Sequence, residues 1–176
     1  NQDQTFAPDY VPSHREELHL AGAKLRVLHT PGHASNHLCF LHETEKILFT
    51  GDHVMQGSTV VINPPDGDML IYLESLRMVM QEPMAYFAPG HGFLIGKPVE
   101  AIERLLVHRL ERENKVLAAL KQASQPQTLE QLVSVVYQDT PTQRHALALR
   151  SLLAHLLKLQ KERRAKETPA GWSLAS

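Results

Sequence analysis

Three short stretches of the sequence end in a side chain that could bind a metal ion. RVLHTPGH, KILFTGD and AYFAPGH each join an apolar segment to a glycine and then to a ligand-type residue, namely His33, Asp52 or His91. Glycine lets the chain leave a strand sharply, because it has no Cβ atom. Imidazoles and a carboxylate suit zinc or a similar borderline metal. The residue types are compatible with a metal site, although ordinary surface turns would also explain them.

The spacing of these residues requires the fold to bring them together. They are separated by 19 (52 − 33) and 39 (91 − 52) residues, which is too far for one local loop. Each follows the apolar part of a predicted strand, and chemistry in layered α/β folds is usually found at the carboxyl ends of strands.

The first hundred residues alternate short apolar runs with Gly and Pro, which predicts strands around one helix. We expect strands at 23–30, 37–43, 46–51, 58–63 and 85–92, with a helix at 69–82. Cys39 lies within an apolar strand and is expected to be buried and inert.

From residue 98 the pattern becomes helical. Apolar residues at helical spacing predict a long helix at 98–123. A second helix is expected after Thr128, a good N-cap, and a third with Pro141 in its first turn. The tail at 166–176 predicts a β-hairpin whose Trp172 packs onto the helices. Three helices and a hairpin are typical of a winged helix.

Charge divides the chain into the same two parts. Residues 1–100 hold 6 Lys+Arg and 12 Asp+Glu, which gives −6, and residues 101–176 hold 12 and 7, which gives +5. We therefore predict two units with different roles. The single cysteine cannot form an internal disulfide, so nothing points to secretion, and no apolar run approaches the ~20 residues of a membrane helix. We therefore expect a cytoplasmic protein without membrane contact.

HTPGHASNH, FTGDHVM and APGHG together resemble the later motifs of the metallo-β-lactamase-fold hydrolases, over most of residues 18–98. The remainder resembles the winged-helix extension of one branch, which includes β-lactamase-like hydrolases and an endoribonuclease. The resemblance implies an α/β fold in which residues 1–100 form the second half of an αββα catalytic domain. Residues 101–176 would form a linking helix and a winged-helix-like domain.

The resemblance also implies roles for the three candidate ligands. His33 matches the third histidine of the first metal, Asp52 the catalytic carboxylate that bridges both metals, and His91 the last histidine of the second metal. The cofactor would be Zn²⁺, two ions in the intact enzyme, with other divalent metals also compatible. A metal-bound hydroxide would attack an acyl substrate (thioester, lactam or lactone) or a phosphodiester.

The chain departs from the family pattern at its beginning. The signature H-x-H-x-D-H, which supplies the other ligands, is absent, and His14, His19 and His29 do not have that spacing. There is also no initiator Met. We therefore expect a chain that lacks its natural N-terminus, carries half a metal site and is inactive alone. Self-association, or pairing with a segment that supplies the missing half, is the expected consequence.

Four other polar residues could support the site. His37 is expected to hydrogen-bond to a metal ligand rather than to bind the metal itself. His53 could line the substrate pocket or have no role. Asp66 and Asp68, in PPDGD, could edge the substrate cleft, but a plain turn explains them equally well.

Two other function classes remain open. A basic winged helix, with Arg163–Lys166 near the wing, could bind RNA, so a nucleic-acid-binding protein or endoribonuclease is one alternative. Its cations, however, alternate with Glu on the helices, as they do on any solvated face. We also expect His108 and Arg109 to face solvent. An inactive scaffold is the other alternative. The partner of a hydrolase would be a small ester or thioester, and that of a nucleic-acid-binding protein would be RNA.

Overall fold

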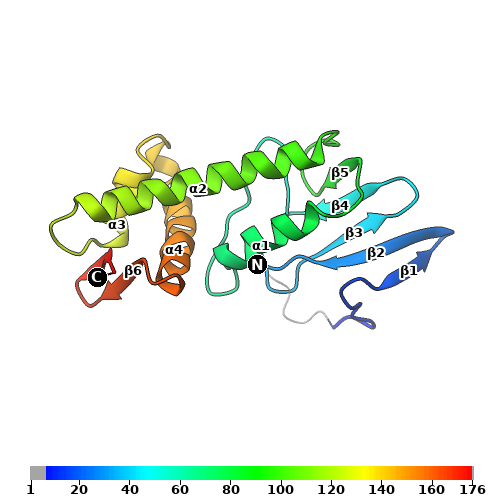
Figure 1. The fold of residues 1–176 in the computed structure, drawn as a ribbon, viewed down its shortest axis with the longest axis horizontal. Coiled ribbons are helices and arrows are strands. Elements are labelled where there is room, and N and C mark those ends of the chain that lie inside the picture. Colours follow the sequence, from blue (N-terminus) through cyan, green and yellow to red (C-terminus); the bar gives the residue numbers. More distant parts are fainter. Residues whose placement is uncertain (1–6, 176) are drawn as a thin grey trace.

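The computed structural model describes residues 7–175 and shows a five-stranded sheet, four α-helices and a small hairpin (Figure 1). The strands follow one another across the sheet in chain order. They are β1 (Glu17–Leu20), β2 (Ala23–His29), β3 (Leu38–His42), β4 (Ile47–Gly51) and β5 (Tyr86–Pro89). Strands β1 to β4 are antiparallel, whereas β4 and β5 are parallel.

This topology decides where the strands end. Because β2 and β4 are each antiparallel to β3, they run in the same direction, and β5 runs with β4. The carboxyl ends of β2, β4 and β5 therefore point to the same end of the sheet, which is called here its carboxyl edge. His33, Asp52 and His91 follow these three ends.

One face of the sheet is covered by α1 (Met69–Val79) and the start of α2 (Pro98–Gln122). Asp68 caps α1, since its side chain accepts hydrogen bonds from the backbone N–H groups of Leu70 and Ile71. Helix and sheet share one buried apolar cluster, which includes Leu28, Cys39, Leu41, Leu48 and Phe87 from the strands and Tyr72, Leu73 and Leu76 from α1. The cysteine is fully buried, as expected.

Helix α2 is shared by both parts of the molecule and runs from the sheet to α3 (Figure 1). Its first turns place Ala101 and Ile102 in the core of the sheet, and its second half places Val116 and Leu120 in a second apolar cluster. In the described part of the chain no helix is both long and apolar enough to cross a membrane.

The second cluster lies among α2, α3 (Leu129–Val136), α4 (His145–Lys161) and the hairpin of β6 (Ala165–Thr168) and β7 (Gly171–Leu174). Thr128 begins α3 in a capping box with Gln131, as the sequence predicts. Trp172 is only 2% exposed and packs with the helices. The α/β class and the winged-helix-like extension are thus both present.

Three local predictions were wrong. Residues 58–63 form no strand; the carbonyls of Val60 and Val61 accept hydrogen bonds from the side chains of Arg109 and His33 instead of from a neighbouring strand. Arg109 is therefore 3% exposed and not solvated. Helix α4 begins at His145, after a 3₁₀ turn (Thr142–Arg144) that follows Pro141. The short strand β1 was not predicted.

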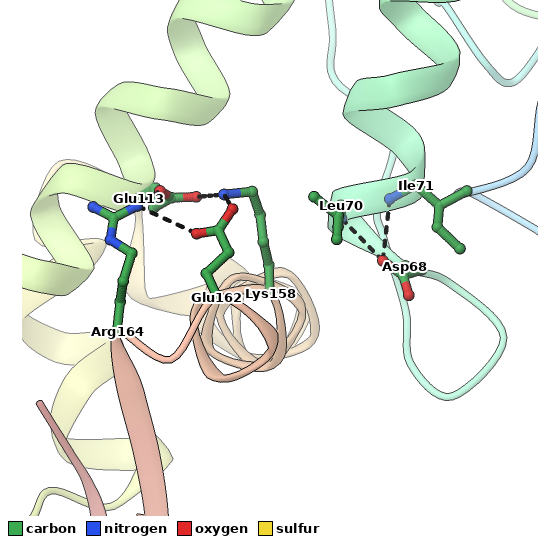
Figure 2. Close-up of polar contacts among 7 residues, drawn as sticks. All are labelled: Asp68, Leu70, Ile71, Glu113, Lys158, Glu162 and Arg164. Atoms are coloured by element: carbon green, nitrogen blue, oxygen red, sulfur yellow. Dashed lines mark hydrogen bonds and ion pairs between the residues drawn. The ribbon is translucent and has the colours of Figure 1, made fainter. Parts of the chain in front are cut away.

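A buried ion-pair network joins α2 to α4 (Figure 2). Lys158 of α4 donates to Glu113 of α2 at 2.7 Å and to Glu162 at 2.7 Å, and Arg164 donates to Glu113 at 2.9 Å. Lys161 also pairs with Asp68, the cap of α1. Removing one member of a buried pair leaves an uncompensated charge, so this network fixes how α4 sits against the other helices.

The opposite face of the sheet is apolar and partly open. Val27, Phe40, Phe49 and Ala88 lie in one cross-strand row on that face. Phe49 is 45% exposed, and Tyr86, on the same face, is 46% exposed.

We expect this face to drive association. Burial of apolar surface contributes roughly 25 cal/mol per Å², so covering a few hundred Å² would contribute several kcal/mol. Sedimentation velocity at micromolar concentration should show oligomers of the wild-type chain. The Phe49→Lys variant should contain a larger fraction of monomer. Val135→Lys is a matched control, because Val135 is 53% exposed on α3. A monodisperse wild-type monomer would contradict this expectation.

The fold also predicts a loss of stability in mild acid. His155 is fully buried in α4, and neither ring nitrogen has a partner among the described residues. Burial, and then the nearby Arg109 and Lys158, lower its pKa to about 3. Below pH 6.5 the unfolded chain binds a proton that the folded chain cannot. The free energy of unfolding therefore decreases as the pH is lowered.

The expected loss from His155 alone is about 2 kcal/mol between pH 7.5 and 5. Urea unfolding at half-unit pH steps measures it. His155→Leu should flatten the curve in this window by about 1 kcal/mol per pH unit. His53, whose pKa burial also lowers to about 3, and His37, whose pKa burial also lowers, should supply part of the dependence that remains. An unchanged slope in the variant would contradict the assignment.

Candidate metal centre

The structure brings His33, Asp52 and His91 together at the carboxyl edge of the sheet. The Nε2 atom of His33 lies 3.9 Å from Oδ2 of Asp52, and Nε2 of His91 lies 3.6 Å from Oδ1 of Asp52. Two donors of a tetrahedral zinc ion are about 3.4 Å apart, given zinc–ligand distances near 2.1 Å. Each pair is therefore close to the separation that one shared ion requires.

Asp52 occupies the central position of this arrangement. Its two carboxylate oxygens face different histidines, Oδ2 towards His33 and Oδ1 towards His91. All three side chains are accessible to solvent, with exposed fractions of 29% for His33, 41% for Asp52 and 75% for His91. This geometry suits a carboxylate that bridges two ions.

His33 is held with one particular nitrogen free. Its Nδ1 atom donates to the carbonyl of Val61 at 2.9 Å, because a carbonyl can only accept. The proton therefore resides on Nδ1, and the Nε2 lone pair is presented on the side of Asp52. Metal-binding histidines are commonly oriented by a hydrogen bond of this kind.

The glycines before the candidate ligands are required by close packing. A Cβ atom on Gly32, whose φ is +130°, would lie 2.4 Å from Cα of Tyr72. On Gly90 a Cβ atom would lie 3.2 Å from Oδ1 of Asp52. The turns can therefore approach helix α1 and one another only without side chains at these positions.

The donor set fits a divalent metal in type but not in number. Among the described residues, no group of three or more His, Cys, Asp or Glu side chains is arranged to hold one ion. A catalytic zinc normally has three protein ligands, whereas each histidine pairs with Asp52 alone. Ligation by His33, Asp52 and His91 thus remains a prediction, and these residues would supply only part of a site.

Two other histidines, His37 and His53, lie behind the centre. His37 shares a 2.8 Å hydrogen bond through Nδ1 with the hydroxyl of Thr30, and its ring lies between those of His33 and His53. Burial is the main cause that lowers the pKa of His37. His53 is fully buried, with its ring against Tyr72, so it belongs to the core and not to the wall of a substrate pocket.

The two aspartates of PPDGD make structural contacts. Asp66 accepts from the backbone N–H of Ser35, in the loop that carries His33, at 3.2 Å. Asp68 caps α1 and pairs with Lys161 (Figure 2 shows the cap). Both therefore hold the loops around the centre.

Sequence reasoning missed two further residues at the site. The Val61 carbonyl carries no side-chain signal, because any residue could supply it. Gln56 links the loops after β4 and β5: its N–H lies 3.4 Å from the His91 carbonyl, and its side chain accepts from the Phe93 N–H at 2.8 Å. Its position four residues after Asp52 in a Gly-rich loop was the available hint.

Comparison with known proteins covers both parts of the chain. The model of the metallo-beta-lactamase superfamily matches residues 1–91, and that of the beta-lactamase associated winged helix domain matches residues 128–172. A beta-lactamase-like protein 2 homolog from Drosophila melanogaster is 33% identical over 172 residues, which cover 90% of this chain and 57% of that protein.

Two other similarities bear on activity and fold. An atrochrysone carboxyl ACP thioesterase from Aspergillus chevalieri is 34% identical over 81% of this chain and 47% of that protein. A metallo-beta-lactamase family protein from Thermus thermophilus superposes with a TM-score of 0.81 at 25% identity, over 93% of this chain and 53% of that one. The chain spans about half the length of the curated relatives it matches.

The close packing at Gly32 generates a prediction. Gly32→Ala should destabilise the protein by at least about 3 kcal/mol, because the new methyl group would meet the backbone of α1 as well as an unfavourable φ. Gly22→Ala is the matched control: φ is +82° there, but nothing lies within 4 Å of the added atom. It should cost only about 1 kcal/mol. Thermal unfolding measures both, and equal losses would contradict the packing argument.

Proposed function

Because the chain belongs to the metallo-β-lactamase superfamily, we propose that it forms part of a zinc-dependent hydrolase that cleaves acyl thioesters. The observation that carries this proposal is the position of Asp52 between two histidines at the carboxyl edge of the sheet. The thioesterase from Aspergillus chevalieri, similar over 81% of the chain, favours a thioester over the other acyl substrates.

The chain's own residues would bind and orient the metal. His33 offers Nε2 because the Val61 carbonyl occupies its Nδ1 proton, and His91 offers Nε2 from the opposite side of Asp52. Asp52, which lies between the two histidines, would be the carboxylate ligand of this part of the site. Zinc bound here would lower the pKa of a water molecule to about 7 and polarise the thioester carbonyl. Further ligands would come from a segment that pairs with this chain.

Zinc binding is the direct test. The 176-residue chain should bind Zn²⁺ weakly, and Asp52→Ala should weaken binding at least tenfold, because it removes the carboxylate that faces both histidines. His19→Ala is a matched control, since His19 is an exposed histidine of β1. Competition with a chromophoric chelator measures the affinities. Equal affinities for the wild type and Asp52→Ala would contradict the proposed ligand set.

Hydrolysis needs the remaining ligands. We expect negligible thioester hydrolysis by this chain alone, measured as released thiol. Fusion to the amino-terminal part of the Thermus thermophilus relative should give zinc-dependent turnover, which Asp52→Asn abolishes. The relative's amino-terminal part alone is the control. Efficient, zinc-dependent turnover by the 176-residue chain would show that the three residues suffice. A well-folded, zinc-loaded fusion that leaves thioesters intact would contradict the proposed activity.

A further inference from the structure

Two adjoining cavities flank the loop that follows Asp52. The first, of about 560 Å³, lies among the loops after β4 and β5 and the first turns of α2. The second, of about 630 Å³, lies between the same loop and the α3–α4 region. They share lining residues, which are Met55, Gly57, Ser58, Thr59 and His108. The two cavities thus adjoin along this loop and α2, and together they are called here the α2 groove.

The groove begins beside the candidate metal centre. Its wall includes Gln56, whose backbone N–H lies 3.4 Å from the His91 carbonyl and whose side chain accepts from the N–H of Phe93. A Cβ atom on Gly92 would lie 2.6 Å from Cβ of Gln56, so the two loops are in tight contact. A molecule bound in the groove would therefore extend away from the site where Asp52 and His91 meet.

The lining combines an apolar surface with positive charge. Apolar side chains come from the loops after β4 and β5 and from helices α2 and α4. They are Val54, Met55, Leu94, Ile95, Leu105, Leu147 and Ala148. Four cations line the groove, namely Lys97, Arg104, Arg112 and Arg144, and no Asp or Glu is among the described residues that line it. Residues 1–100 carry a net charge of −6 in total. An acid-free groove beside such an acidic unit indicates a ligand that is both extended and anionic.

Not all of this positive charge is offset. One carboxylate, Glu100, faces both Lys97, at 2.9 Å, and Arg104, at 3.7 Å. Arg112 is paired with Asp139 at 2.9 Å and lies over the ring of Tyr137. For Arg144 the described residues provide no ion-pair partner. Arg104 and Arg144, one in each cavity, are thus the cations best able to bind an anion.

We propose that the α2 groove binds the leaving group of the thioester, and that this leaving group is a phosphorylated pantetheine arm. This inference rests on the proposed thioesterase function. The thiol end would lie at Asp52 and His91, the amides and methyl groups would lie along the apolar lining, and the phosphate would bind Arg144 in the second cavity, which has no ion-pair partner among the described residues. Arginine suits phosphate because its planar fork donates two parallel hydrogen bonds. Each cavity has the size of a small-molecule site.

Binding to the 176-residue chain tests this inference without any hydrolysis. By titration calorimetry at low salt, pantetheine 4′-phosphate should bind at least tenfold more tightly than pantetheine. Added salt should reduce that preference, because it screens the arginine charges. Arg144→Gln should reduce it several-fold and leave pantetheine binding unchanged, whereas Arg104→Gln, in the first cavity and facing Glu100, should reduce it less. Arg150→Gln is the matched control, since Arg150 is exposed on α4 and outside the groove.

The phosphorylated arm occurs both in coenzyme A and on carrier proteins, and the two can be separated. Tighter binding of coenzyme A or of a carrier protein that bears the arm identifies the source, and either result supports the inference. Equal binding of pantetheine and its 4′-phosphate would overturn it. So would arginine-dependent binding of a single-stranded RNA that the phosphate does not displace. The 176-residue chain could bind the phosphorylated arm selectively while the fusion protein shows no hydrolysis. That result would support the inference about the α2 groove and contradict only the proposed reaction.

Discussion

The whole site depends on how closely the turns that follow β2, β4 and β5 can approach one another and helix α1. Gly32 lies against the backbone of Tyr72, and Gly90 lies against the carboxylate of Asp52, at distances where a Cβ atom would force its neighbours to shift. The same contacts pack α1 onto the sheet, so the requirement for glycine belongs to the core as much as to the site. This close approach explains how residues 19 and 39 positions apart present side chains within 4 Å of one another.

Helix α2 is the second constraint, because both apolar clusters use it. Its buried polar residues are held from both sides: Arg109 donates to the Val60 carbonyl, and Glu113 accepts from Lys158 and Arg164. Buried charges require such partners, since an unpaired one costs several kcal/mol. The winged-helix-like unit is therefore fixed against the sheet unit by polar contacts that tolerate little displacement, and the α2 groove keeps its two walls.

The turns at the strand ends could be predicted from the sequence, whereas the contacts that surround them could not. Pro-Gly-His and Thr-Gly-Asp after apolar runs indicated His33, Asp52 and His91, because glycine turns and strand ends are local features. Arg109 was expected in solvent, because a cation among glutamates on a helix usually faces water, yet it is buried. Its partner is a backbone carbonyl 49 residues away, and the sequence carries no signal for a carbonyl. The role of Val61 was invisible for the same reason.

The error at residues 58–63 shows why this segment matters. STVVIN has the composition of a strand, but Pro64 and Pro65 follow it, and no strand of the described residues 7–175 takes its hydrogen bonds. Side chains satisfy its carbonyls instead, with Arg109 on Val60 and His33 on Val61. Backbone groups that a sheet would have used are thus free to orient a candidate ligand and to hold α2. Because Thr59, Val60 and Val61 also line the α2 groove, one irregular segment links the proposed metal ligand, the central helix and the proposed substrate path.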